Sequence, residues 1–199
     1  VLVEGNHEFK HRRYFSHYLR EQSHGTPNPI KRCEDLAEIQ AKLSKEDRQF
    51  LGNSVMAYSL EGADACVVHG GVSPRLVDLP AGLRVTDLKG KKKKMASTVY
   101  FTRMVSPEGK PVSLGKETDE DVPWASVYDG RFGHVYYGHE HHKEPKEDKH
   151  ATGLDLGCVY GHKLAAAVLE DGAKGGDHHV VTVQAARAYW DRKLHNLED

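Results

Sequence analysis

The sequence predicts an α/β fold, because short apolar runs typical of buried strands alternate with segments whose apolar residues recur at helical spacing. Three of these runs end in an Asn or a His beside glycine, and functional groups of open α/β sheets gather at such strand ends. A chain of 199 residues usually forms one domain with a sizeable core. We therefore expect a single domain over residues 1–199.

The first part of the chain is expected to hold one short strand and two helices. Residues 1–3 are an apolar run, and residues 10–20 carry aromatic and aliphatic side chains at helical spacing. The sequence HGTPNP that follows predicts a turn. Apolar spacing over 33–51 predicts a second helix, and Ser44 with the acidic residues after it is typical of a fresh helix N-terminus.

Most of the remaining segments have the pattern of strands. The segments ADACVVHGGV and GHVYYGHEHH each predict a buried strand that ends near a histidine, His69 in the first and His139 in the second. The segment ATGLDLGCVYGHKLAAAVLEDG predicts a strand, a glycine turn and another strand. The alternating segment DHHVVTVQAA predicts an edge or closing strand, on which we expect His178 and His179 to face solvent.

Two segments are expected to lie outside the core. Residues 89–122 hold a four-lysine run, several Gly and Pro and the mixed-charge stretch GKETDED, so we expect a long loop insertion. The lysines at 91–94 predict a solvated loop face, and their functional interpretation is an electrostatic funnel for a polyanion. Residues 185–199 are expected to form a polar C-terminal tail.

Composition argues against several classes of partner and site. The 28 basic and 29 acidic side chains give a formal net charge of -1, which offers no argument for a nucleic acid duplex as partner. Because no run of about eighteen apolar residues occurs, we expect no membrane span within these residues. Cys33, Cys66 and Cys158 lie far apart, which disfavours a disulfide framework and favours a reduced, intracellular chain.

Polar side chains at the predicted strand ends indicate a metal site. Asn6 and His7 follow the first run, His69 the second and His139 the third, each beside glycine. Glycine lets the backbone and a ligand approach closely. Amide oxygen and neutral imidazole are good ligands for a first-row divalent ion, although carboxylates that would complete such a site are few here.

Four ordered motifs resemble a known family. GNHE, VVHGGVSP, YGHEHH and GLDLGCVYGHKLAAAVL together are similar to the calcineurin-like metallophosphoesterases, in their phosphoprotein-phosphatase branch. PWASVYDGRFGHVYYGH followed by ATGLDLGCVYG most resembles the ApaH-like phosphatases, relatives of the bacterial symmetrical diadenosine tetraphosphatase that include the vacuolar endopolyphosphatase type of fungi and protists. The resemblance runs over residues 1–169 and implies a β-sandwich of mixed sheets flanked by helices.

The resemblance also implies what lies outside this sequence. Two earlier motifs of the family, Asp-x-His and Gly-Asp-x-x-Asp-Arg-Gly, supply the first metal and the bridging Asp, and neither stands before GNHE in this sequence. The chain thus resembles an N-terminally truncated family member whose first βαβ portion is missing. We expect such a sheet to expose an apolar edge.

The family's site residues carry over to individual positions. The resemblance implies two divalent metal ions, of Mn, Fe, Zn, Co or Mg, and a hydroxide bridging them that attacks phosphorus. It assigns Asn6, His69 and His139 to the second metal and assigns protonation of the leaving oxygen to His7. Glu8 is expected to support these ligands without binding the metal itself.

His141 has two interpretations of equal weight. Many calcineurin-like phosphoesterases use both imidazoles of Gly-His-x-His, because residues i and i+2 of an extended strand point the same way. The ApaH-like branch usually has one such His. His142 is expected to be a polar loop residue, and the GLDLGCVYG segment a structural glycine turn in which Cys158 is inert.

Five arginines are candidates for binding the non-reacting phosphates of a substrate, since guanidinium groups grip phosphate bidentately. Arg13 and Arg131 are favoured because they are close in sequence to the motifs, and Arg75 is retained with them. The full set is Arg12, Arg13, Arg75, Arg103 and Arg131.

The resemblance implies a metal-dependent phosphoester or phosphoanhydride hydrolase. The block from YDGRFGH to YGHEHH is ApaH-like, so polyphosphate or a dinucleoside polyphosphate is the leading substrate. One alternative is a serine/threonine protein phosphatase, and another is a non-catalytic remnant that folds or binds only. Members of the family act in the cytoplasm or in vacuole-like compartments, and the sequence does not decide between these.

Overall fold

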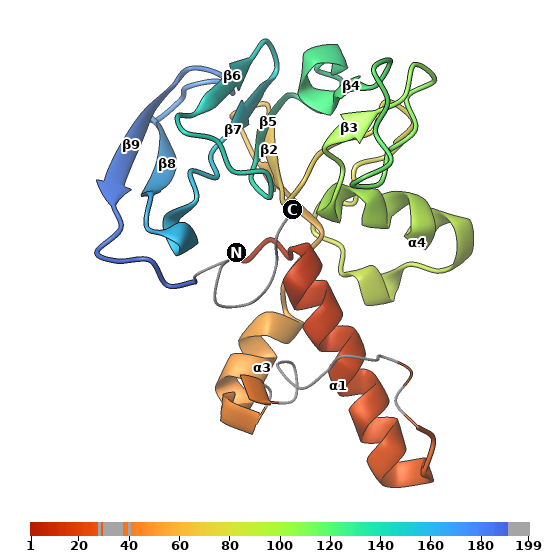
Figure 1. Cartoon of the computed structure of the whole chain (residues 1–199). Helices are drawn as coiled ribbons and strands as arrows, with labels where there is room; N and C mark the ends of the chain where they lie inside the picture. The colour runs from red at the N-terminus through yellow and green to blue at the C-terminus, as the bar shows by residue number, and fades with distance from the viewer. Residues whose placement is uncertain (28, 30–37, 40, 191–199) are drawn as a thin grey trace.

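A five-stranded mixed sheet forms the centre of the molecule (Figure 1). The computed structural model describes residues 1–27, 29, 38–39 and 41–190. The strand order is β1-β2-β5-β7-β6, in which β2, β5 and β7 run parallel to one another and the two outer strands are antiparallel to their neighbours. Its strands are β1 (Ala57–Leu60), β2 (Ala65–Val68), β5 (His134–Tyr137), β6 (Lys146–Asp148) and β7 (Ala151–Gly153).

The central strands are buried on both faces, which explains their nearly continuous apolar sequences. Cys66 and Val135 are register partners, so their side chains share one face. That face packs on the main core with Trp124, whose ring centroid lies 5.0 Å from that of Tyr137. The opposite face carries Tyr136 and is covered by other elements.

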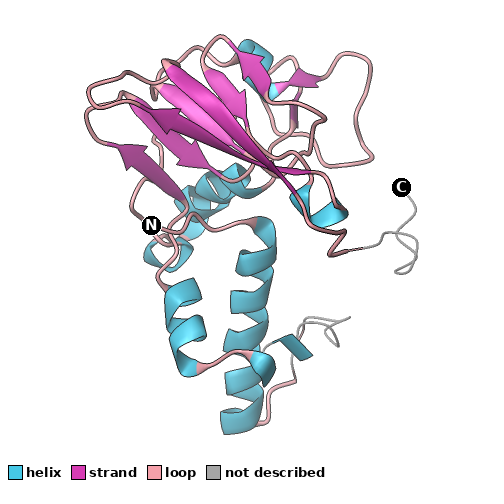
Figure 2. Cartoon of the chain, turned by 90° about the vertical axis from the view of Figure 1, so that its left-hand side faces the viewer, coloured by secondary structure: helices cyan, strands magenta, loops and turns pink. Residues whose placement is uncertain are grey.

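A two-stranded antiparallel sheet, β8 (Lys163–Leu169) with β9 (His178–Gln184), lies against this opposite face (Figures 1 and 2). The contact is polar: His178 Nδ1 lies 3.2 Å from the Tyr136 hydroxyl, and His178 Nε2 lies 3.4 Å from Glu147 Oε1. The prediction that His178 faces solvent is therefore wrong, since only 5% of its side chain is exposed. Alternation shows which residues share a face but not which face another element covers.

Two helices extend away from the sheets (Figures 1 and 2). Helix α1 (Asn6–His24) begins four residues before the predicted helix and includes the whole Asn-His-Glu sequence in its first turn. The second is α3 (Lys45–Gly52), and its predicted start is confirmed because Ser44 and Asp47 exchange hydrogen bonds at 3.0 and 2.9 Å. Residues 33–37 of the predicted second helix, with Cys33, lie outside the described residues.

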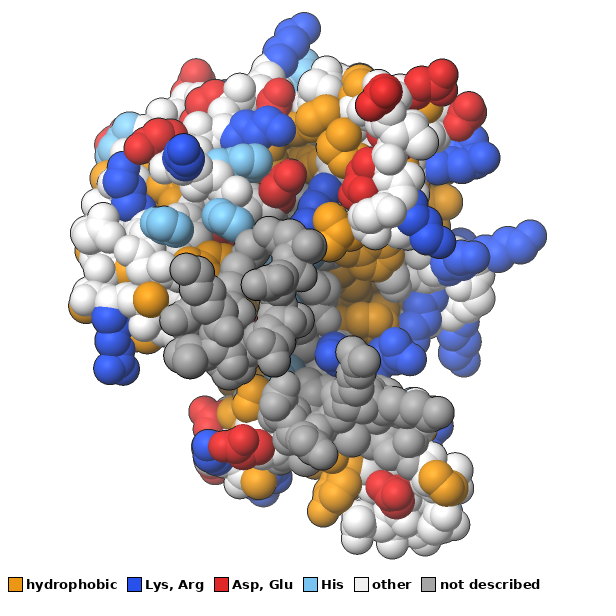
Figure 3. All heavy atoms as spheres, viewed as in Figure 1, with side chains coloured by type: hydrophobic (Ala, Val, Ile, Leu, Met, Phe, Trp, Pro, Cys, Tyr) orange, Lys and Arg blue, Asp and Glu red, His pale blue; other side chains and the backbone are white. Residues whose placement is uncertain are grey.

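The first part of the segment 89–122 belongs to the core, so the expectation of a loop insertion that leaves the core is wrong there. It forms α4 (Gly90–Ala96), the 3₁₀ turn η2 (Ser97–Tyr100) and β3 (Met104–Val105), which pairs with β4 (Val122–Pro123). Four of its apolar side chains are buried in the main core: Ala96, Val99, Tyr100 and Val105. The lysines at 91–94 therefore lie on a helix and not on a loop, and Lys and Arg side chains gather on this side of the molecule (Figure 3).

Three short 3₁₀ turns complete the described elements: η1 (Val85–Asp87), η3 (Trp124–Val127) and η4 (Cys158–Tyr160). Beyond β9 the chain turns back, and the amides of Tyr189 and Trp190 donate to the Val159 carbonyl at 2.8 and 3.0 Å. Helices and mixed sheets occur in one α/β fold, as the sequence predicts. Among the helices of the described residues, none has the length and apolar character needed to cross a bilayer.

Candidate active site

The ends of β2 and β5 bring two predicted ligand residues together. Because the two strands are parallel neighbours, their carboxyl ends reach the same edge of the sheet. The Gly138 amide donates to the His69 carbonyl at 2.9 Å, which joins the residues just beyond the two strands. As a result, the imidazole centroids of His69 and His139 lie 5.0 Å apart.

The first turn of α1 brings Asn6 to the same place. A β-bridge between Val3 and Val55 positions the preceding residues, and Asn6 Oδ1 lies 3.0 Å from His69 Nε2. Gly5 permits this approach, since a Cβ there would lie 2.8 Å from His69 Cε1. The sequence predicted that Asn6 and His7 follow the end of a strand. In the structure they begin α1, shortly after the isolated β-bridge at Val3.

Glu8 lies beside these residues and closes the helix start. Its Oε2 accepts a hydrogen bond from the Gly5 amide at 3.0 Å, which satisfies one of the free amides of the first turn. This contact is consistent with the supporting role expected for Glu8.

A buried charge pair anchors α1 to the core. Glu4 is only 1% exposed, forms an ion pair with Arg12 and accepts a hydrogen bond from the Tyr100 hydroxyl. The ring of Phe9 stacks on that of Tyr100 with centroids 5.1 Å apart. Arg12 is thus engaged inside the protein, which disfavours the phosphate-binding role considered for it.

One cavity of about 470 Å³ joins the predicted residues. Both strand ends and the first turn of α1 contribute to it, and His7 lies on it with an exposed side chain. Among the described residues, no hydrogen bond holds the His7 imidazole. The lining residues are Asn6, His7, His69, Arg103, His139, Glu140, His141, Asp155, Val159 and Tyr160.

Burial favours the neutral form of the two central imidazoles. Burial lowers the pKa of His69, against the opposing effect of the carboxylates of Glu8 and Asp155. Burial, together with the charge of Arg103 and with His69, lowers the pKa of His139 to about 4. His139 also has a left-handed backbone with φ 72°, a conformation that non-glycine residues adopt mainly where other contacts enforce it.

These donors fit part of a metal site. Two neutral imidazoles and the Asn6 amide oxygen converge on one cavity, and Asp155 adds a carboxylate to its lining. In the part of the chain that the structure describes, however, no group of three or more His, Cys, Asp and Glu side chains is arranged to hold a metal ion. The described residues therefore suit part of the ligand shell of an ion.

The arginines favoured from the sequence do not line this cavity. Arg13 lies over the ring of Phe9 at 5.6 Å, Arg75 donates to the Glu108 carbonyl at 2.8 Å, and Arg131 is paired with Asp129 at 2.7 Å. The structure instead places Arg103 on the cavity, with its Nε buried and without a hydrogen-bond partner among the described residues. Proximity in sequence to a motif did not identify this residue, because the approach of the loop after η2 to the site is a long-range contact.

His141 remains with both interpretations open. It lines the cavity with an exposed side chain, and its ring centroid lies 5.3 Å from that of Tyr160. It also lines a neighbouring cavity of about 510 Å³ with His142 and His162, and histidine side chains gather on this face near β8 (Figure 3).

Asp155 was missed because its segment was interpreted as a structural glycine turn. It follows β7, whose end is joined to β5 by the Leu154 amide donating to the Tyr137 carbonyl at 2.8 Å. Its Oδ1 accepts from the Gly157 amide at 2.9 Å, so the turn is structural and also positions a carboxylate. The signal that could have found it was a fourth predicted strand followed by a polar residue beside glycines.

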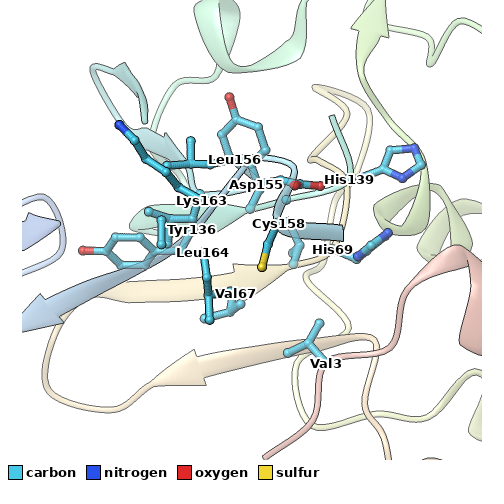
Figure 4. Close-up of a pocket in the computed structure, with 15 residues that line it drawn as sticks. Val3, Val67, His69, Tyr136, His139, Asp155, Leu156, Cys158, Lys163 and Leu164 are labelled. Carbon is cyan, nitrogen blue, oxygen red and sulfur yellow. The ribbon is translucent and has the colours of Figure 1, made fainter. Parts of the chain in front are cut away.

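A further, mostly apolar cavity of about 390 Å³ lies beneath the site, between the central sheet and β8 (Figure 4). His69, His139 and Asp155 lie together at one end of it, and Cys158 lines it.

Cys66 is buried on the sheet face that packs on the main core, and burial raises the pKa of its thiol to about 12, which makes it unreactive.

Comparison with known proteins gives matches to dinucleoside tetraphosphatases. The chain is 27% identical over 165 residues to the asymmetrical bis(5'-nucleosyl)-tetraphosphatase PrpE of Bacillus subtilis, covering 81% of this chain and 60% of the relative. It is 28% identical over 168 residues to that of Halalkalibacterium halodurans, covering 82% and 60%. The chain thus spans about three fifths of the length of these relatives. No family model matches the sequence.

A solved structure supports the fold. A protein described as a "putative diadenosine tetraphosphatase" superposes with a TM-score of 0.60 at 22% identity, covering 92% of this chain and 67% of the other. The mixed-sheet α/β fold implied by the resemblance is thereby confirmed.

Proposed function

We propose that this chain carries part of the active site of a metal-dependent phosphoanhydride hydrolase that acts on dinucleoside polyphosphates. The observation that carries the proposal is the cavity shared by Asn6, His7, His69 and His139, which belong to three separate motifs of the sequence. The relatives named as bis(5'-nucleosyl)-tetraphosphatases favour this substrate class over inorganic polyphosphate and over a phosphoprotein.

Each residue has a distinct task in the proposed reaction. His69, His139 and Asn6 would hold a divalent ion, with Asp155 adding a nearby carboxylate. When bound, such ions lower the pKa of water and neutralise phosphoryl oxygens. His7, which lines the cavity with an exposed side chain, would donate a proton to the departing phosphate oxygen.

Arg103 is the cation that the site offers to a phosphate. Its side chain lines the cavity and forms no ion pair among the described residues. Its buried Nε has no hydrogen bond that would have to break before a phosphate could bind. A phosphate oxygen would supply that missing acceptor, and the guanidinium would neutralise charge on the chain being cut.

The test is hydrolysis of three substrates in parallel, with Mn²⁺ or Mg²⁺: a dinucleoside tetraphosphate, long-chain polyphosphate and a phosphoserine peptide. We expect preference for the dinucleoside tetraphosphate and a loss of at least about a hundredfold in His139→Ala. His17→Ala, on a later turn of α1, is the matched control and should retain activity. Preference for the peptide or for polyphosphate would overturn the proposed substrate.

A binding function without turnover is the second candidate. The observation in its favour is that, among the described residues, no group of three or more His, Cys, Asp and Glu side chains is arranged to hold a metal ion. Nucleotide binding without hydrolysis, in this chain and in any longer protein that contains it, would establish this second function in place of the first.

A further inference from the structure

A smaller cavity adjoins the candidate active site and differs from it in character. It measures about 290 Å³ and shares Asn6, Arg103 and His139 with the site. Its other walls come from the segment that follows η2, namely Phe101, Val112, Leu114 and Glu117. The cavity is thus polar at the shared end, and the other end is apolar apart from Glu117.

The apolar end is made of side chains that the fold leaves exposed. Phe101 is 47% exposed and Leu114 is 76% exposed, and each lines this one small cavity. Exposed large apolar side chains that converge on a hollow are typical of ligand sites. Glu117 adds one carboxylate to the lining, and no hydrogen bond engages it among the described residues.

Phe101 is fixed relative to the active site. The Gly70 amide donates to the Val99 carbonyl at 2.7 Å, and a Cβ on Gly70 would lie 2.8 Å from the Phe101 amide nitrogen. The turn that follows His69 therefore packs directly on the backbone that carries Phe101. The backbone that carries the Phe101 ring is thereby held beside the ligand residue His69.

Arg103 connects the two cavities, since its side chain lines both. A phosphate bound at Arg103 would leave its attached nucleoside within reach of the apolar end. The 290 Å³ of space is at the small end of ligand pockets and suits a single base with its sugar better than a peptide.

We infer that this cavity binds the nucleobase of the substrate, by stacking on Phe101 and Leu114 and by a hydrogen bond from an exocyclic amino group to Glu117. Base stacking on an aromatic side chain contributes substantially to binding of nucleotides and tolerates different bases. The carboxylate of Glu117 accepts hydrogen bonds only, so it favours a base that presents an amino group. This inference rests on the proposed function, and it makes the substrate a nucleotide rather than inorganic polyphosphate.

The experiment measures binding of ATP and of inorganic tripolyphosphate to the full chain by calorimetry, without a requirement for turnover. In Phe101→Ala we expect the Kd for ATP to rise about tenfold, while the Kd for tripolyphosphate changes less than twofold. Phe50→Ala removes another exposed phenylalanine, on α3 and away from the cavity, and should leave both unchanged.

A second variant tests Glu117. Glu117→Gln should weaken binding of ATP about threefold and leave binding of purine riboside triphosphate, which lacks the amino group, unchanged; Glu120→Gln is the matched control. Equal effects of Phe101→Ala on ATP and tripolyphosphate, no effect on either, or no binding of ATP by the wild-type chain would each overturn the inference.

The two proposals can fail separately. If the wild type binds ATP through Phe101 but hydrolyses no dinucleoside tetraphosphate, the base-binding site stands and the proposed function falls. If it hydrolyses that substrate with a KM that Phe101→Ala does not change, the proposed function stands and the base-binding site falls.

Discussion

Two regions form the candidate site, and they are held in different ways. His69 and His139 follow adjacent parallel strands whose ends are joined by a backbone hydrogen bond. Asn6 comes from a single β-bridge and a helix start, anchored by the buried pair of Glu4 and Arg12. The sheet side depends on close packing distributed over many residues, whereas the helix side depends on a few specific contacts. The helix side should therefore be the easier of the two to displace.

The largest expected effect is on the sheet side. A Cβ on Gly71 would lie 2.6 Å from the Thr102 carbonyl oxygen and would also collide with the Trp124 indole. Gly71→Ala should lower the free energy of unfolding by about 3 kcal/mol, because neither the backbone nor the buried ring can move freely. Urea unfolding would measure this loss.

The matched control for that variant is Gly52→Ala, at the end of α3. A Cβ there has no atom within 4 Å, so we expect no loss of stability and a small gain from the better helix former. Equal effects of the two substitutions would show that the turn after His69 is less closely packed than the structure indicates.

A slightly smaller effect is expected on the helix side. Glu4→Ala leaves the Arg12 guanidinium and the Tyr100 hydroxyl without their shared partner, which should cost about 2–3 kcal/mol. Hydrogen exchange should show faster opening of residues 2–9 than of β2 and β5. Uniform opening of both regions would contradict the difference between them.

Local sequence signals predicted the helix start and the strand ends. The other features of the site depend on long-range contacts. The capping residues at Ser44 and the glycines after the strands are local, so the helix start and the strand ends were predictable. Arg103 and the buried side of His178 depend on which element covers which face, and no periodicity in one sequence contains that information. The lysine run shows the same limit, because its helix is held by the buried residues that follow it.

The smallest expected effect concerns the other face of the sheet, which supports the strand ends from below. Burial, with the charge of His178 adding, lowers the pKa of His134, whose Nε2 lies 2.8 Å from Thr152 Oγ1. Below pH 6.5 the unfolded chain takes up a proton that the folded His134 resists, so stability is lost as pH falls and is fully present above 6.5. Unfolding curves across pH 7.5 to 5 should show this loss.

His134→Gln keeps a group able to hydrogen-bond Thr152 but does not titrate, so its stability should fall less steeply with acidification than that of the wild type. His179→Gln, at an exposed position on β9, is the control and should follow the wild type. Parallel curves for wild type and His134→Gln would show that the buried face of the sheet does not contribute to the pH dependence.

The most direct test of the account is a double-mutant cycle between the two regions, with hydrolysis of a dinucleoside tetraphosphate as the readout. If Asn6 and His139 serve one site, each alanine substitution should lower kcat/KM by at least about a hundredfold, and the double variant should lose little more than either single one. Losses that add independently, or substitutions that leave hydrolysis unchanged, would contradict a single site built jointly by the strand ends and the first turn of α1.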